Sequence, residues 1–251
     1  MWFRCCFFVL LVSTIGLWAD VSMRLGSGNF STSDGRLLEP ANLAKLNALE
    51  AYGVGYARFG VYRNEYWRNG EPYLGLDPLM LEAEKRGLRV LISFNWKPGE
   101  VEIGGYSLWY AVGEAYARRY GKGGTLWLEE GISDYGVEVF AAINEPEWEP
   151  DYHAPYREAL KGLADGVHSV DRNLKVIPAG WHSADLTNSS DFTQWGFGTA
   201  VADLLNDGTL DGIDLHIYST RDGGGGQLPG RFRFESAQGL FDRTKAALGI
   251  T

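Results

Sequence analysis

Apolar residues along this chain form short runs separated by longer amphipathic stretches. The runs are rich in β-branched and aromatic residues, so they predict strands. The predicted strands cover 23–25, 55–62, 88–94, 137–143, 174–179 and 212–218. The stretches between them predict helices over 40–51, 78–86, 106–120, 156–170, 197–206 and 235–248. Strands that alternate with helices are typical of βα units in a parallel sheet with right-handed crossovers.

An α/β chain of this kind forms either an open doubly wound sheet or a closed (β/α)8 TIM barrel. A dinucleotide-binding sheet normally carries a glycine-rich phosphate turn after its first strand. The segment Gly26-Ser27-Gly28 has no third glycine, and the glycine run at 223–226 has no lysine after it. We therefore expect a TIM barrel. Six of its eight βα units can be counted, so the barrel is expected to be incomplete and to form one catalytic domain over 20–251.

The first 19 residues differ from the rest. Arg4 is followed by a short apolar stretch and then by small residues up to Ala19, which is the pattern of a secretory signal peptide. The alternative, a membrane anchor, needs a longer apolar stretch. We expect removal of 1–19 and a secreted protein, extracellular or periplasmic. Both cysteines, Cys5 and Cys6, lie in this segment, so the mature chain would have no disulfide and no thiolate metal site.

The composition narrows the range of partners. The formal net charge is −9 and there is no basic run, which argues against nucleic acid and anionic membranes as partners. The chain has 9 Trp and 13 Tyr, and many of the tryptophans adjoin polar or turn residues. Such rings are often half-buried at the ends of elements, but together they also suit the stacking of sugar rings. A monomer that binds carbohydrate is expected.

The tripeptide Asn144-Glu145-Pro146 follows the apolar run 137–143 directly. Glu145 would therefore stand at the carboxyl end of a buried strand, where α/β folds place their chemistry. The proline prevents further strand pairing and gives the carboxylate a fixed turn. Glu145 is the main candidate for a catalytic group.

Arg58 in the second predicted strand, Asn144 and Glu145 after the fourth, and His216-x-Tyr218 in the sixth form a recognisable set. With them the chain resembles the large clan of retaining glycoside hydrolases on (β/α)8 barrels, which includes cellulases, mannanases and β-xylosidases. The resemblance implies that Glu145 is the general acid/base and that Asn144 binds the sugar 2-hydroxyl. It also implies that Arg58 orients the nucleophile carboxylate, although an ion pair in the barrel floor is the structural alternative.

Further substrate contacts are implied by the same resemblance. His216 and Tyr218 are two apart on a strand, so both are expected to point into the barrel as hydrogen-bond donors. Asn95 and Trp96 end the third strand and would form a subsite for a sugar ring. Trp181, after the fifth strand, is a further candidate for substrate binding, with burial as the alternative.

The clan uses a second glutamate, at the end of strand seven, as the nucleophile. By this count strand seven lies beyond residue 251, and no other acid in the chain ends a strand opposite Glu145. Retention requires carboxyl groups about 5–5.5 Å apart, so no nucleophile is assigned and the chain alone is expected to be inactive. The hypothesis is a β-glycan hydrolase that acts by double displacement.

The sequence leaves two alternatives from other functional classes. A catalytically inactive barrel that only binds carbohydrate would keep the aromatic side chains. A metal-dependent hydrolase is disfavoured because the four histidines show neither His-x-His nor His-Glu-x-x-His spacing. No metal and no cofactor are expected.

Overall fold

The computed structural model of the chain describes residues 8–9, 25–31, 38–95, 104–144, 153–183, 197–217, 242 and 244–250. Five strands lie side by side in parallel and in chain order: β2 (Leu25–Ser31), β3 (Tyr56–Val61), β6 (Arg89–Phe94), β7 (Val139–Ala142) and β8 (Lys175–Pro178). The short strand β1 (Phe8–Val9) pairs with β2 in the antiparallel direction. A second parallel pair consists of β9 (Trp181–Ser183) and β10 (Leu215–Ile217).

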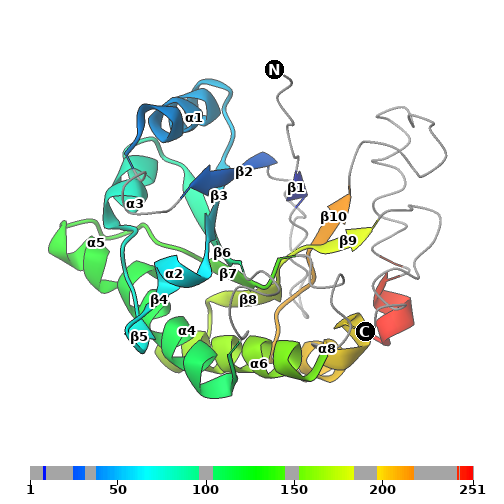
Figure 1. Cartoon of the computed structure of the whole chain (residues 1–251). Helices are drawn as coiled ribbons and strands as arrows, with labels where there is room; N and C mark the ends of the chain where they lie inside the picture. Colours follow the sequence, from blue (N-terminus) through cyan, green and yellow to red (C-terminus); the bar gives the residue numbers. More distant parts are fainter. Residues whose placement is uncertain are drawn as a thin grey trace, which may run out of the picture.

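Helices follow the strands and cover one face of the sheet. They are α1 (Pro40–Ala51), α2 (Arg63–Tyr66), α3 (Asp77–Glu84), α4 (Tyr106–Tyr120), α5 (Thr125–Glu129), α6 (His153–Val170) and α8 (Phe197–Asn206). Figure 1 shows the longer helices in an arc around the outside of the sheet. The predicted α/β fold with parallel βα units is confirmed, and the described strands account for six of the eight positions of a (β/α)8 barrel. Of the helix predicted over 235–248, the structure describes residues 242 and 244–248, which are helical.

The two faces of the sheet bury different side chains. Alternate residues of β3 (Ala57, Phe59 and Val61) belong to a large hydrophobic core shared with the helices. The opposite, inner face carries a smaller cluster of Leu91, Val139, Ala141, Ile177 and Ala179. This alternation is the period-2 pattern of a sheet whose two faces are both covered. Any side chain on the inner face therefore points into the interior of the barrel.

Helices α4 and α6 touch backbone to backbone. A Cβ atom added at Gly162 would lie 2.3 Å from the carbonyl oxygen of Tyr106, and one added at Gly166 would lie 2.2 Å from that of Tyr110. From the other side, a Cβ at Gly113 would lie 2.5 Å from the carbonyl oxygen of Leu163. Real Cβ atoms do not approach so closely, so these glycines set the distance between the two helices.

The first strand differs from its prediction. It was expected at 23–25 but is described as Leu25–Ser31, so Gly26-Ser27-Gly28 lies within a strand. Pairing with β3 explains the difference, because Gly26 and Ser27 lie opposite Tyr56 and Ala57. The register shifts between Ser27 and Phe30, as expected where glycines weaken a regular ladder.

A buried polar cluster joins α6 to the amino end of β8. Asp211 accepts hydrogen bonds from the backbone N–H of Val176 (2.8 Å) and from Nζ of Lys175 (3.1 Å), and its Oδ2 lies 3.1 Å from Nε2 of His168. Arg172 contacts Nδ1 of the same imidazole. Because arginine can only donate, Nδ1 must accept, which assigns the proton of a neutral His168 to Nε2.

The stability of the fold should depend on the charge of Asp211. Burial by itself raises the pKa of this carboxyl, but the hydrogen bonds from His168, Val176 and Lys175 outweigh burial and lower the pKa. The resulting stabilisation is therefore present above pH of about 4 and is lost as the pH falls through the lowered folded-state pKa. Asp211→Asn should reduce the free energy of unfolding at pH 7 by about 1–3 kcal/mol, measured by urea titration.

The matched control for Asp211 is Asp134→Asn, because the Asp134 side chain is 93% exposed and lies 3.9 Å from Lys122. This change should leave the urea midpoint unaltered. The difference between wild type and Asp211→Asn should also shrink at pH 3. A difference that stays constant with pH would show that the carboxylate charge contributes nothing.

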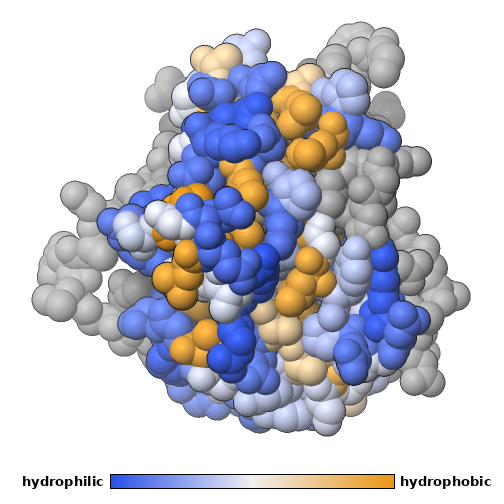
Figure 2. Space-filling model, turned by 90° about the vertical axis from the view of Figure 1, so that its left-hand side faces the viewer, coloured by the Kyte–Doolittle hydropathy of each residue, from blue (hydrophilic) through white to orange (hydrophobic). Residues whose placement is uncertain are grey.

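Figure 2 shows hydrophobic residues on one side of the molecule in several patches separated by polar residues. The exposed large hydrophobic side chains of the described residues are Leu38, Tyr52, Tyr62 and Leu128. Scattered exposure of this kind is ordinary for a protein surface. Among the described helices, none combines the length and hydrophobicity that crossing a bilayer requires.

Candidate functional site

The inner face of the sheet is arranged in rows of register partners. The lower row contains Arg58, Leu91, Val139 and Lys175, and the next row towards the carboxyl end contains Gly60, Ser93, Ala141 and Ile177. The lower row thus has the larger side chains. The upper row has small ones from Gly60 to Ala141, which leaves space for the Arg58 side chain to extend towards the carboxyl ends of the strands.

Arg58 links three strands at this end of the sheet. Its Nη2 donates to Oγ of Ser93 on β6 (2.8 Å) and to Oδ1 of Asn144, just after β7 (2.7 Å). Ser93 is fully buried and Arg58 is half-buried. The guanidinium therefore crosses β6, which lies between β3 and β7, and has Ser93 as an intermediate support. Hydrogen bonds from a charged donor are stronger than neutral ones, so the three side chains of Arg58, Ser93 and Asn144, called here the Arg58 cluster, are held firmly in place.

Asn144 reaches the inner face because the alternation of β7 breaks at its end. Val139 and Ala141 are inner-facing, so regular alternation would turn Ile143 inwards. Instead, Ile143 joins the large outer core together with Ala142. The next side chain, Asn144, then meets Arg58. Since its Oδ1 accepts from the guanidinium, the two N–H groups of Nδ2 are the donors that the Asn144 amide can offer to a ligand.

Asn95 lies at the same end of the sheet, directly after β6. Its backbone N–H donates to the carbonyl of Val61 (2.7 Å). Its Oδ1 is buried and has no hydrogen-bond partner within the described structure. The amide covers Gly60, where an added Cβ would lie 2.8 Å from Nδ2 of Asn95. Asn95 is therefore placed where a substrate-binding role was predicted, and that role stays a prediction.

Three of the predicted site residues, Glu145, Trp96 and Tyr218, lie outside the described residues. For His216 the backbone is described: it belongs to β10 and is the register partner of His182 in β9. The prediction that His216 and Tyr218 both point into the barrel is thus untested. The structure brings together Arg58 and Asn144, and it adds Ser93, which the sequence analysis did not select.

The prediction for Trp181 is wrong in the described structure. Its ring is fully buried, and Nε1 donates to the hydroxyl of Tyr156 on α6 (2.9 Å). Ile177 and Ala179 are inner-facing, so continued alternation would have turned residue 181 inwards as well. Gly180, with φ of +51°, interrupts the alternation. Trp181 is therefore a core residue between the sheet and α6, and the alternative of burial holds.

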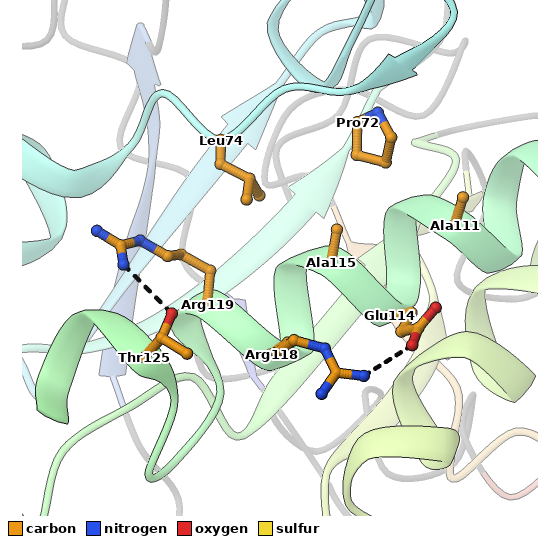
Figure 3. A pocket seen from close by; sticks show the side chains of 8 residues that line it. All are labelled: Pro72, Leu74, Ala111, Glu114, Ala115, Arg118, Arg119 and Thr125. Atoms are coloured by element: carbon orange, nitrogen blue, oxygen red, sulfur yellow. Dashed lines mark hydrogen bonds and ion pairs between the residues drawn. The ribbon is translucent and has the colours of Figure 1, made fainter.

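A surface pocket of about 380 Å³ lies on the helical side of the fold. Pro72 and Leu74 face Ala111 and Ala115 of α4 across it, as Figure 3 shows. The charged groups at its edge are already engaged in ion pairs and hydrogen bonds: Glu114 with Arg118 (2.7 Å), and Arg119 with Thr125 (3.2 Å) and Asp77 (2.6 Å). This pocket is built from the outer face of α4 and is separate from the Arg58 cluster.

Within the described ranges, no group of three or more histidine, cysteine, aspartate or glutamate side chains is arranged to hold a metal ion. The chemistry that the described cluster offers is hydrogen bonding and positive charge. Arg58 supplies a fixed cation and Asn144 supplies amide donors beside Glu145 in the sequence. Such a set is suited to hydroxyl groups and carboxylates.

No protein-family model and no curated protein matches this chain. Among solved structures, it is similar to an exo-β-1,4-mannosidase from Opitutaceae bacterium strain TAV5, with 17% identity over 69% of this chain and a TM-score of 0.47. It is similar to a glucosidase from Croceicoccus marinus, with 18% identity over 67% of this chain and a TM-score of 0.45. It is also similar to an endocellulase from Pyrococcus horikoshii, with 11% identity over 79% of this chain and a TM-score of 0.45. The chain spans 35%, 38% and 65% of the lengths of these three proteins.

Proposed function

We propose that this chain is part of a secreted glycoside hydrolase that cleaves β-linked polysaccharides or oligosaccharides by a retaining double displacement. The observation that carries the proposal is the hydrogen bond between Arg58 and Asn144 at the carboxyl end of the sheet (2.7 Å). Glu145 is the next residue, so the carboxyl group with the proposed catalytic role adjoins a side chain that is held firmly. Carbohydrate is the proposed ligand.

Glu145 acts as the general acid/base in this proposal. It protonates the leaving glycosidic oxygen in the first step and deprotonates the attacking water in the second. Asn144 donates from Nδ2 to a sugar hydroxyl, because its Oδ1 already accepts a hydrogen bond from Arg58. Arg58 supplies positive charge that favours the ionised form of the nucleophile carboxylate. The nucleophile itself is not assigned within this chain.

The alternative is a barrel that binds glycans without cleaving them. The natural protein, expressed from its own gene, should be incubated with a panel of glucans, mannans and xylans, and both reducing ends and bound polysaccharide should be measured. Release of new reducing ends by the wild type supports the hydrolase. Binding without any release favours the alternative, and the absence of both would contradict each function.

Ser93 provides a test of the cluster itself. Ser93→Ala removes the support of the Arg58 guanidinium and should lower kcat/KM by about 10–150-fold, because a hydrogen bond to a charged group contributes about 1.5–3 kcal/mol. Ser93→Thr retains the hydroxyl and should keep most of the activity. Steady-state kinetics on the best substrate of the panel measure both variants. Equal kinetics for wild type and Ser93→Ala would remove this cluster from the mechanism.

A further inference from the structure

Three buried hydrogen-bond donors lie together in α2 without an acceptor. They are Nε and Nη1 of Arg63 and the hydroxyl of Tyr66, none of which has a hydrogen-bond partner within the described structure. The Arg63 guanidinium carbon lies 5.6 Å from the centre of the Tyr66 ring. Buried polar groups in folded proteins are nearly always paired, so a group of three unpaired donors calls for an explanation.

The surroundings of these donors are aromatic. Arg63 also lies 5.6 Å from the centre of the Trp67 ring. Tyr66 packs against Phe94 and Trp109 with ring centres 5.5 and 5.3 Å apart. Aromatic faces attract a guanidinium but do not accept hydrogen bonds as oxygen does. The rings therefore hold the guanidinium in place, while its buried Nε and Nη1 atoms have no acceptor among the described residues.

No carboxylate compensates the charge of Arg63 within the described residues. The acid nearest in sequence, Glu65, accepts a hydrogen bond from the backbone N–H of Tyr62 (2.8 Å). Burial lowers the pKa of Arg63 and raises that of Tyr66, as expected for groups that lose water without gaining a counter-ion. By contrast, Arg86, Arg118 and Arg119 each form an ion pair shorter than 3 Å.

The position of Arg63 connects it with the candidate site. It follows the carboxyl end of β3, the strand that carries Arg58, after one intervening residue. In βα barrels the loops at this end of the strands form the binding site. Arg63 is only half-buried, so its guanidinium lies at the boundary between the core and the surface.

We propose that Arg63 and the Tyr66 hydroxyl form a subsite for a carboxylate on the glycan, so that the substrate contains uronic acid residues. This inference rests on the proposed function. A cation together with three donors and no acceptor suits an anionic oxygen ligand, and a planar guanidinium matches the two oxygens of a carboxylate. The net charge of −9 does not oppose such a contact strongly, because exposed charges are screened beyond about 8 Å at physiological ionic strength.

The test compares matched neutral and acidic ligands by calorimetric titration of the natural protein. The neutral oligosaccharide that binds best in the polysaccharide panel is paired with its C6-oxidised form, or with its glucuronic acid-substituted form for a xylan. Polygalacturonate and alginate oligomers are included. We expect the acidic partner to bind at least about tenfold more tightly than the neutral one in the wild type. Arg63→Gln should abolish this difference and leave the neutral ligand within about twofold of its wild-type affinity.

Two further variants distinguish a ligand site from a structural role. Arg63→Lys should recover only part of the preference, because an ammonium cannot form the paired contact. Arg68→Gln is the matched control, since its guanidinium stacks on Tyr73 at 3.7 Å in the adjoining hairpin, and it should keep the full preference. Tyr66→Phe should weaken only acidic ligands and should not lower the melting temperature, because it removes a buried hydroxyl without a partner.

The outcomes separate this inference from the proposed function. Neutral ligands that bind while acidic ones bind no better would overturn the carboxylate subsite and leave the glycan-binding function intact. A marked loss of melting temperature in Tyr66→Phe would show an internal partner for the hydroxyl and would also overturn it. If no glycan of either kind binds, both proposals fall. Tight acidic binding that depends on Arg63 supports the subsite even without hydrolysis.

Discussion

In the natural protein expressed from its own gene, replacing Glu145 with glutamine is expected to lower kcat on β-linked oligosaccharides by about 10²–10⁴-fold, which is the usual contribution of general acid–base catalysis. Glutamine keeps the shape of the side chain but cannot give a proton to the leaving oxygen or take one from water. Ligand affinity should change little, because Asn144 and Arg58 remain hydrogen-bonded. Steady-state kinetics and calorimetric binding on the same preparation measure both quantities.

Two features of the Glu145→Gln variant would identify the lost step. Dinitrophenyl glycosides have an acidic leaving group that needs little protonation, so their glycosylation step should be nearly unaffected. The alkaline limb of the pH–rate profile, which reports loss of the proton from the general acid, should disappear. Glu147→Gln, two residues further along, is the matched control and should retain wild-type kinetics. Unchanged turnover in Glu145→Gln would exclude Glu145 from the reaction.

Replacing Gly166 with alanine should destabilise the fold by about 1–3 kcal/mol, and Gly162→Ala should act similarly. The added methyl group would meet the backbone carbonyl of Tyr110 or Tyr106 at 2.2–2.3 Å. A carbonyl within a helix cannot rotate away, so α4 and α6 must separate. This strain exceeds the gain of up to about 1 kcal/mol that alanine normally brings to a helix. Urea unfolding monitored by circular dichroism measures the change.

Gly55→Ala is the control for these two variants. Gly55 has no heavy atom within 4 Å of an added Cβ, so alanine there should be neutral or stabilise the fold by up to about 1 kcal/mol. The double variant Gly162→Ala/Gly166→Ala should show a cost below the sum of the single ones, because the first change already separates the helices. Wild-type stability for Gly166→Ala would mean that the helices are not in backbone contact.

The strands and long helices could be predicted from the sequence because their periodicity agrees with their burial. The helices over 40–51, 106–120 and 197–206 have the predicted bounds, and the third strand differs by one residue at its start. The missed elements among the described residues are α2, α5, β1, β9 and a hairpin made of β4 (Trp67–Arg68) and β5 (Glu71–Pro72). All of them are too short to show a period.

The hairpin nevertheless had a local signal. Arg68 pairs with Glu71, so Asn69-Gly70 forms a two-residue loop, and both residues have positive φ (54° and 88°). Asn-Gly is the sequence that such a turn favours most strongly. The signal is weak in this sequence because the flanking strands have only two residues each and one ends in proline.

The candidate site was less predictable because it depends on two places where the alternation of inward-facing and outward-facing side chains along a strand is interrupted. Asn144 faces inwards only because Ile143 turns outwards, and Trp181 is buried because Gly180 redirects the chain. Neither change can be derived from residue type alone. Ser93 could have been noticed as the polar residue within the apolar run 88–94, on the face that it shares with Arg58. Arg63 and Tyr66 left no sequence signal, since their unpaired state appears only in three dimensions.

The upper row of inner-facing residues, which includes Gly60, Ser93 and Ala141, also limits the depth of the barrel interior at the carboxyl ends of the strands. Added atoms in this row would disturb its neighbours, because a Cβ at Gly60 would lie 2.8 Å from Nδ2 of Asn95 and Ala141 is fully buried on the face along which Arg58 extends. The depth of this end of the barrel and the arrangement of Arg58 and Asn95 are therefore coupled, and neither can change without the other.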